Sequence, residues 1–208
     1  MSIVVVDYGM GNLRSVSKAL EHVAPGETVV VTADPDVILS SGRLVVPGQG
    51  AMPDCMRNLE ASGAREAVLE AMREKPYLGI CLGLQMLFER AEEGATRGLA
   101  VLAGEVPRFR PDRLKNPGLK IPHMGWNEVL QARPHALWQG IPDASRFYFV
   151  HSYYPAPREA ALAAATCMYG APFTCAVARD NIFAVQFHPE KSQSAGLQLL
   201  SNFVRWRP

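Results

Sequence analysis

Residues 77–85, with the sequence YLGICLGLQ, decide how this chain can fold. Their apolar first half predicts a buried strand, and the run from Leu82 to Arg90 predicts a helix directly after it. Gly79 and Gly83 lie two residues before and two residues after Cys81. Glycines at these positions permit a close approach of the backbone at a sharp turn. We therefore expect Cys81 at a strand-to-helix turn, exposed at the carboxyl end of a sheet.

Strands and helices alternate on either side of this turn. The pattern predicts strands at 3–7, 28–32, 44–46 and 77–80, and helices at 13–23, 64–75 and 82–90. Further strand-like runs follow at 147–151, 162–168, 174–178 and 182–187, before a last helix at 193–206. The predicted fold class is α/β, with three layers and a mostly parallel central sheet flanked by helices. The second half should add an antiparallel extension, and residues 1–208 are expected to form a single domain.

Composition narrows the function classes. The chain has 208 residues, of which 48% are hydrophobic and 20% charged, as in ordinary globular proteins rather than disordered chains or coiled coils. Lys and Arg total 21 and Asp and Glu total 20, so no basic excess points to nucleic acid or to an anionic membrane. The uncharged stretch 160–178 fits two short strands around a turn at 170–172 better than a membrane span. Four cysteines without a C-x-x-C pair favour a reduced, cytoplasmic protein.

Three residues together could perform thiol chemistry. The start of a helix favours the thiolate form of Cys81 and offers free N–H groups to an oxyanion. His188 follows the apolar run 182–187, so it also lies at the end of a strand, and Pro189 imposes a bend that could bring Glu190 back to it. A thiol nucleophile needs a base, and the base needs an orienting acceptor. Cys81, His188 and Glu190 supply these roles; the alternative is a buried structural cysteine beside an ordinary loop.

With these motifs the chain resembles the class I (triad) glutamine amidotransferases, whose fold it is then expected to share. The resemblance rests on residues 79–85, GICLGLQ, and 187–190, FHPE. Further segments narrow it to the family of glutaminase subunits of imidazole glycerol phosphate synthase. These segments are 7–16 (DYGMGNLRSV), 122–127 (PHMGWN), 149–153 (FVHSY) and 188–192 (HPEKS).

The resemblance implies a reaction and a partner. Cys81 would attack the carboxamide of glutamine, His188 would act as base and then as acid toward the leaving ammonia, and Glu190 would orient His188. A glutamyl thioester would form and be hydrolysed by water. The ammonia would pass to a (β/α)₈-barrel cyclase subunit, in a heterodimer that serves histidine biosynthesis. The resemblance implies no metal and no organic cofactor.

Further site residues carry over by position. The backbone N–H groups of Gln49 and Leu82 would bind the oxyanion; Gln49 stands where the family usually has valine. Candidate contacts to the substrate are Gly48, Gln85, His151, Ser152 and Tyr153. Gln85 could instead be a solvated helix residue, His151 a strand-end histidine, and Ser152 and Tyr153 plain sheet residues.

The resemblance also places five residues at the partner interface or the ammonia exit: Asn12, His123, Trp126, Asn127 and Lys191. Trp126 could equally belong to the core, and Lys191 could be a solvated lysine. The G-x-G at residues 9–11 lacks the third glycine and the acidic residue of a dinucleotide-binding loop, so we reject a nucleotide cofactor there.

Three other functions stay open on the sequence alone. One is a different amidotransferase of the same triad class. Another is a non-catalytic binding protein on a flavodoxin-like scaffold, in which alkylation of Cys81 would leave function intact. The third is a cysteine peptidase or chaperone with a similar turn, which a glutaminase assay would separate.

Overall fold

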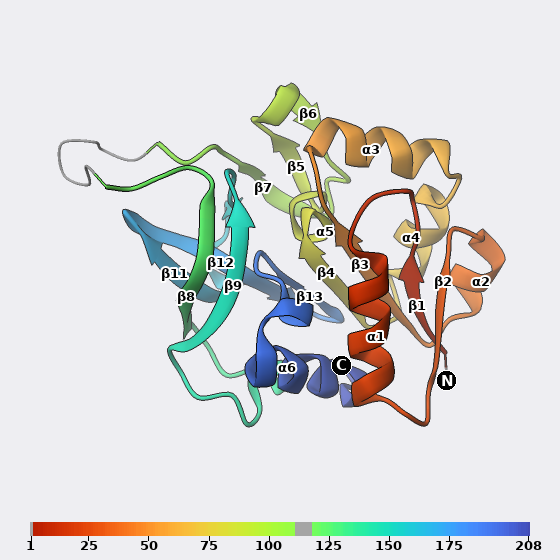
Figure 1. Ribbon diagram of the computed structural model, residues 1–208. Helices are drawn as coiled ribbons and strands as arrows, with labels where there is room; N and C mark the ends of the chain where they lie inside the picture. The colour runs from red at the N-terminus through yellow and green to blue at the C-terminus, as the bar shows by residue number, and fades with distance from the viewer. Residues whose placement is uncertain (1, 111–117) are drawn as a thin grey trace.

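A computed structural model describes residues 2–110 and 118–208. Two sheets are present in these residues (Figure 1). The larger sheet has nine strands, in the spatial order β2 (Thr28–Thr32), β1 (Ser2–Val6), β3 (Arg43–Gly48), β4 (Tyr77–Cys81), β13 (Ile182–Val185), β12 (Ala171–Arg179), β11 (Ala163–Tyr169), β8 (His123–Gln131) and β9 (Ser145–His151). The smaller sheet has four, in the order β10 (Ala156–Pro157), β7 (Leu102–Val106), β5 (Phe88–Ala91) and β6 (Thr96–Arg97).

The direction of the strands changes part-way across the larger sheet. From β2 to β13 every neighbouring pair is parallel, and from β13 to β9 every neighbouring pair is antiparallel. The predicted α/β fold with an antiparallel extension is therefore confirmed, and the extension supplies four of the nine strands. The carboxyl ends of β3, β4 and β13 lie side by side, because parallel neighbours end at the same edge.

Helices cover both faces of the parallel part. Their bounds are α1 (Leu13–Val23), α2 (Pro35–Ser40), α3 (Met52–Ala61), α4 (Arg65–Ala71), α5 (Leu82–Gln85) and α6 (Gln193–Arg205). Short 3₁₀ turns occur at η1 (Glu93–Ala95), η2 (Ala136–Trp138), η3 (Ala160–Leu162) and η4 (Pro189–Lys191). None of the helices in the described residues is both long and apolar enough to cross a membrane.

Strand β1 contributes side chains to two hydrophobic cores, one on each face of the sheet. Ile3 and Val5 pack with α1 and α6 on one side, whereas Val4 and Val6 pack with α2, α3 and α4 on the other. This follows from the alternation of side chains along a strand. Figure 1 shows α1 and α6 together in front of the sheet at the bottom, whereas α3 and α4 lie above them and α2 lies to the right. The result is the predicted three-layer arrangement.

Two predicted helices are shorter than the sequence pattern indicates. The helix predicted to Arg90 ends at Gln85, and the chain continues as strand β5. Tertiary pairing overrides helix propensity here, because Phe88 is buried and β5 pairs with β7. The helix predicted for 64–75 is α4, which ends at Ala71. There the side-chain amide of Asn181 donates to the carbonyl groups of Met72 and Lys75 and so satisfies the end of the helix.

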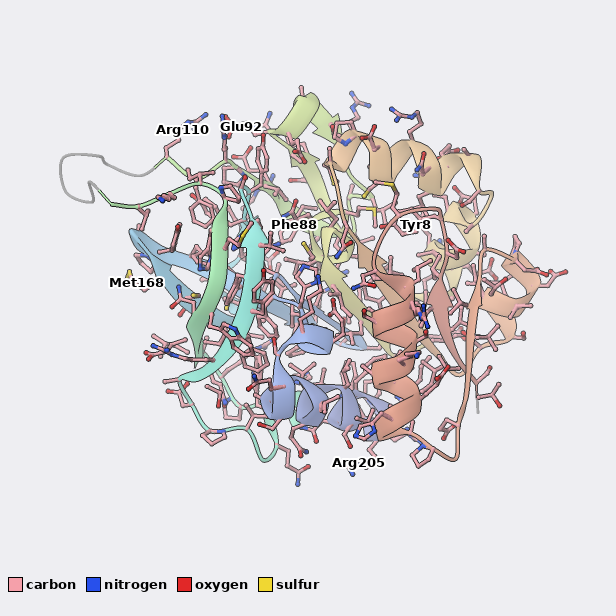
Figure 2. The ribbon with its side chains drawn as sticks, viewed as in Figure 1. Tyr8, Phe88, Glu92, Arg110, Met168 and Arg205 are labelled. Atoms are coloured by element: carbon pink, nitrogen blue, oxygen red, sulfur yellow. The ribbon has the colours of Figure 1, made fainter. Side chains whose placement is uncertain are left out.

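The remaining predicted elements agree with the structure to within a few residues. Helix α1 and strand β2 have the predicted bounds, and the hairpin of β11 and β12 turns at Gly170. The sequence analysis missed α2, α3, the strand β8 and the whole smaller sheet. The outer face of the antiparallel extension carries exposed apolar side chains, among them Met168 on β11, which is 57% exposed (Figure 2).

Candidate active site

Cys81 lies at the turn between β4 and α5, as predicted. Its backbone has φ 57° and ψ −108°, a left-handed conformation that is rare for a residue with a side chain. A Cβ on Gly79 would lie 2.6 Å from the carbonyl oxygen of Gly83, and a Cβ on Gly83 would lie 1.8 Å from that of Val46. Both glycines are therefore required by close backbone packing. Strain of this kind persists where the surrounding structure over-determines it, as at functional sites.

The expected exposure of Cys81 is not found. The residue is only 6% exposed and lines a small cavity of about 150 Å³. The walls come mainly from the turn itself, from the loop after β3, from the 3₁₀ turn η1 and from the end of β9. The lining residues are Gly50, Cys81, Leu82, Gln85, Glu93, Pro122, Val150, His151, Ser152 and Tyr153. The cavity is smaller than the ~300–1,000 Å³ of sites for drug-sized ligands, so it suits a ligand of amino-acid size.

His188 and Glu190 form a buried pair at the end of β13. Nδ1 of His188 lies 2.8 Å from Oε1 of Glu190, and the side chains are 2% and 1% exposed. The turn η4 begins at Pro189 and folds Glu190 back onto the ring, as the sequence predicted. The other ring nitrogen, Nε2, is buried and makes no hydrogen bond of ordinary geometry within the described residues.

The charge of His188 follows from its neighbours. Burial lowers its pKa, but the negative charge of the nearby Cys81 sulfur, together with Glu190, raises it by more. The net pKa of His188 is about 10. The ring is therefore protonated at neutral pH, with a thiol on one side and a carboxylate on the other. Such a group can donate a proton to a leaving amine.

The end of β3 lies directly beside the cysteine. Gly48 is in register with Cys81, and a Cβ on Gly48 would lie 2.6 Å from Cβ of Leu82. The hydroxyl group of Tyr8 donates to the carbonyl oxygen of Pro47 at 2.7 Å and holds the strand at this point. Gln49 follows as the next residue, half-buried, with Gly50 at φ 96° after it. The two predicted oxyanion donors, Gln49 and Leu82, thus come from segments that meet at Cys81.

The predicted substrate residues gather around the same cavity. Gln85 is buried rather than solvated, and its Nε2 donates to Oε1 of Gln186 at 2.9 Å and to the carbonyl oxygen of Tyr153 at 3.3 Å. His151 is also buried, and its Nδ1 donates to the same carbonyl oxygen at 2.7 Å. Ser152 also lines the cavity. Tyr153 therefore acts in these contacts through its backbone.

The sequence analysis missed two residues of the site. Gln186 is completely buried, and its Nε2 lies 3.6 Å from Sγ of Cys81. Glu93 lines the cavity, and its Oε2 accepts a hydrogen bond from the backbone N–H of Met52 at the start of α3. Gln186 lies two residues before His188 at the end of a predicted strand, so its position was a usable signal. Glu93 carries no comparable pattern.

The proposed interface residues do not share one face. Trp126 is 43% exposed on the outer face of β8, edge-on to Tyr148, whereas His123 on the opposite face is buried. Asn127 is half-buried and its amide contacts Nε2 of His123 at 3.2 Å. His123 is therefore buried on the inner face of β8, because side chains alternate along a strand.

The other two predicted interface residues, Asn12 and Lys191, lie near the edge of the sheet that carries Cys81. Oδ1 of Asn12 accepts from the backbone N–H of Ser15 and caps α1. Lys191 is exposed in η4, next to Glu190.

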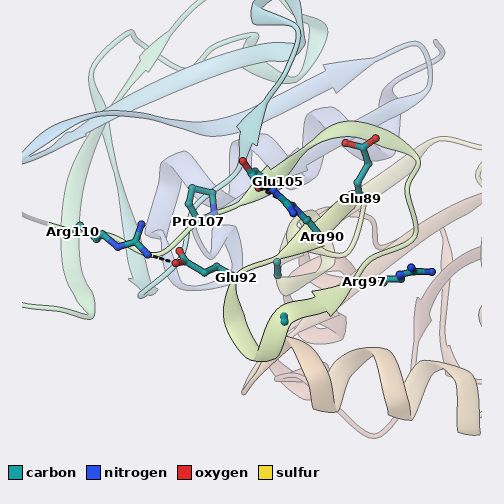
Figure 3. A pocket seen from close by; sticks show the side chains of 9 residues that line it. Glu89, Arg90, Glu92, Arg97, Glu105, Pro107 and Arg110 are labelled. Atoms are coloured by element: carbon teal, nitrogen blue, oxygen red, sulfur yellow. Dashed lines mark hydrogen bonds and ion pairs between the residues drawn. The ribbon is translucent and has the colours of Figure 1, made fainter.

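A larger pocket lies elsewhere, on the smaller sheet, with a volume of about 680 Å³ (Figure 3). Its charged side chains largely pair with one another: Arg110 with Glu92, and Arg90 with Glu105. Its lining in the described residues holds no cysteine and no histidine. The larger volume of this pocket therefore does not identify the catalytic site, because the candidate catalytic cysteine lines the smaller cavity.

Residues 4–206 match the family described as glutamine amidotransferase class-I. The chain belongs to this family. Two amidotransferase structures confirm the fold alone. One, a glutamine amidotransferase, has a TM-score of 0.71 at 17% identity and covers 97% of each chain. The other, a glutamine amidotransferase from Thermotoga maritima, has a TM-score of 0.62 at 18% identity and covers 91% of this chain and 76% of its own.

Closer relatives of this amidotransferase narrow the family. The imidazole glycerol phosphate synthase subunit HisH of Dechloromonas aromatica is 64% identical, over 100% of this chain and 97% of its own. The protein of the same name from Aromatoleum aromaticum is 60% identical, over 99% of each. At this identity the chain also belongs to the HisH family, and the resemblance inferred from the motifs is confirmed.

Proposed function

We propose that this chain hydrolyses glutamine to glutamate and ammonia as the glutaminase subunit of imidazole glycerol phosphate synthase. The observation that carries the proposal is the strained turn that places Cys81 in the wall of a small cavity, near the buried His188–Glu190 pair. The kinship with HisH subunits supports the identity of the synthase.

The reaction follows from these groups. The Cys81 thiolate attacks the carboxamide carbon and forms a tetrahedral intermediate whose oxyanion accepts from the N–H groups of Gln49 and Leu82. The protonated ring of His188 gives its proton to the nitrogen, so ammonia leaves and a glutamyl thioester remains. The ring, now neutral, takes a proton from water, whose oxygen attacks the thioester. Glutamate leaves and Cys81 regains the thiolate.

Glu190 orients the ring throughout. It holds Nδ1 of His188, so Nε2 must carry the proton that is exchanged. Gly48, Gln85, His151, Ser152 and Tyr153 surround the substrate: Gly48 gives the room that a Cβ would remove, and the other four line the cavity.

The ammonia passes to a partner subunit, a (β/α)₈-barrel cyclase, in the cytoplasm, and the product belongs to histidine biosynthesis. The whole chain acts as one domain in this heterodimer. Asn12, Trp126 and Lys191 are the candidates for direct contact with the cyclase. His123 and Asn127 would act behind them, because their side chains lie on the inner face of β8.

The decisive experiment is a glutaminase assay of the chain alone, with the cyclase, and with the cyclase and its ligand. We expect low activity alone and full activity only in the liganded complex. A chain that hydrolyses glutamine at the full rate alone would contradict coupling. A chain inactive with this cyclase but active with another synthase subunit would assign it to another triad amidotransferase. Full function after alkylation of Cys81 would support a non-catalytic binding protein.

A further inference from the structure

Gln186 is a buried polar residue that touches the nucleophile and has no role in the reaction described so far. It follows β13 directly, is completely buried, and places Nε2 3.6 Å from Sγ of Cys81. Its Oε1 accepts from Nε2 of Gln85 at 2.9 Å. An amide in such a place loses its hydration on folding and needs partners for both ends. Here one partner is a glutamine and the other is the reactive sulfur.

The direction of this amide is set by a backbone group. The carbonyl oxygen of Tyr153 can only accept hydrogen bonds, and it accepts from Gln85 and from His151. Gln85 must therefore present its NH₂ group to Tyr153, and the same NH₂ group reaches Oε1 of Gln186. Gln186 is left with its own NH₂ group facing the sulfur. The series of hydrogen bonds that begins at the Tyr153 carbonyl therefore places a donor, the NH₂ group of Gln186, at the sulfur of Cys81, and not an acceptor.

Resting on the function proposed above, we propose that Gln186 is a positioning residue that stabilises the Cys81 thiolate by an N–H···S hydrogen bond, with its polarity imposed by the Tyr153 carbonyl through Gln85. A donor bonded to the charged form of a group favours that form. Two groups then stabilise the thiolate. The His188 ring must give up its proton during the reaction, whereas the Gln186 amide keeps its protons.

This difference gives Gln186 a distinct part in the reaction. When His188 hands its proton to the leaving ammonia, its charge near the sulfur is lost. The Gln186 amide keeps its dipole through that step and still faces the sulfur when the thioester breaks and the thiolate leaves. We therefore expect Gln186 to affect kcat more than KM, because it contacts the sulfur and does not line the glutamine cavity.

The test measures the sulfur directly and needs neither glutamine nor a partner. The isolated chain is treated with iodoacetamide between pH 5 and 10, and alkylation of the Cys81 peptide is followed by mass spectrometry. Gln186→Met keeps the length of the side chain and removes the donor. Gln198→Met on α6 makes the same change at a half-buried glutamine that bonds Asn202 instead. The other three thiols serve as internal references, because burial raises their pKa, for Cys55 to about 11 and for Cys167 to about 12.

We expect Gln186→Met to move the pH midpoint of Cys81 alkylation upward by about one unit, which is about tenfold less thiolate below the midpoint. Gln85→Met, which frees the Gln186 amide to turn, should give a smaller shift in the same direction. Gln198→Met should give none. An unchanged midpoint in Gln186→Met overturns the proposal.

Two further outcomes are decisive. Should Gln186→Met not fold, Gln85→Met decides alone: an upward shift supports the proposal and an unchanged midpoint overturns it. Glutaminase activity is assayed separately in the complex. A shifted midpoint in a chain without glutaminase activity supports the role of Gln186 at the sulfur while the proposed function fails, so the two failures can be told apart.

Discussion

Two buried pairs that contain histidine lie close to the same cavity, and they carry opposite charge states. One is His188 with Glu190, and the other is His123 with His151, whose ring nitrogens lie 2.9 Å apart. Burial lowers the pKa of all three histidines. Nevertheless the pKa of His188 rises to about 10, whereas those of His123 and His151 fall to about 4 and about 3.

These pKa values differ because the neighbouring groups differ, and not because of the depth of burial. His188 faces a thiol and a carboxylate, which can both be negative and favour its charged form. His151 has the Tyr153 carbonyl and a second histidine, and the nearby charge of His188 lowers its pKa further. The tautomers of the second pair follow: Nδ1–H of His151 donates to Tyr153, so its Nε2 accepts from Nδ1–H of His123. One pair is prepared to move protons, and the other is a neutral support for the cavity wall.

The largest effect is expected when the negative partner of His188 is removed. Cys81→Ala should abolish glutamine hydrolysis, because the thioester cannot form. The same variant, bound to the cyclase, should still use added ammonium, because this chain only supplies the ammonia. Steady-state assays with glutamine and with ammonium measure both. Residual glutamine hydrolysis near the wild-type rate would assign the chemistry to another group.

Substitutions of the two members of the His188–Glu190 pair should lower kcat by different amounts. His188→Ala should lower kcat by about 10²–10⁴, the usual range for general acid–base catalysis. Glu190→Gln should lower it less, because it removes orientation and charge but leaves the proton carrier. Kinetics of both variants in the liganded complex give the comparison. Equal losses would mean that Glu190 does more than orient the ring.

The oxyanion strand allows the backbone and side-chain contributions to be separated. Gln49→Pro deletes the N–H group and should lower kcat by about 10²–10³, the cost of one oxyanion donor. Gln49→Val keeps the N–H group and restores the usual family residue, so it should stay within a few-fold of wild type. The ammonium-dependent reaction should be spared in both. If the valine variant were as damaged as the proline variant, the side chain would be the working group.

The smallest effects should appear in the pH dependence of stability, where the two pairs act in opposite directions. Unfolded histidines titrate near pH 6.5. The contribution of His123 and His151 is therefore present above 6.5 and lost as pH falls toward about 4 and about 3. The contribution of His188 is present below 6.5 and lost as pH rises through about 10. His123→Gln should flatten the acid side of the profile and His188→Gln the alkaline side.

Denaturant unfolding from pH 4 to pH 10 measures this profile, and the change on the acid side should be on the order of a few kcal/mol. His22→Gln on the exposed side of α1 is the matched control and should change the free energy of unfolding by less than about 0.5 kcal/mol. Identical profiles for His123→Gln and His188→Gln would remove the contrast between the two pairs.

Local patterns in the sequence predicted the catalytic turn well, for reasons that lie within a few residues. Gly79 and Gly83 are needed because β4, α5 and Val46 approach too closely for a Cβ, and Pro189 directs Glu190 back to His188 within one short turn. The strand β5 was beyond such reasoning. The sequence pattern continued the helix through residues 86–90, and only pairing with β7 and β6 makes residues 88–91 a strand.

The sequence by itself therefore determined the parallel α/β core, the turn at Cys81 and the kinship with amidotransferases, because these depend on periodicity, glycine spacing and short motifs. Only the tertiary structure decided which histidine is charged and which way the Gln186 amide points. The charge of His188 depends on the Cys81 sulfur, which lies 107 positions away in the sequence, as well as on Glu190. The direction of the amide depends on Gln85 and Gln186, 101 residues apart, meeting at 2.9 Å, and on the carbonyl group of Tyr153, to which Gln85 donates. Burial makes each such contact strong, and no local pattern specifies its partner.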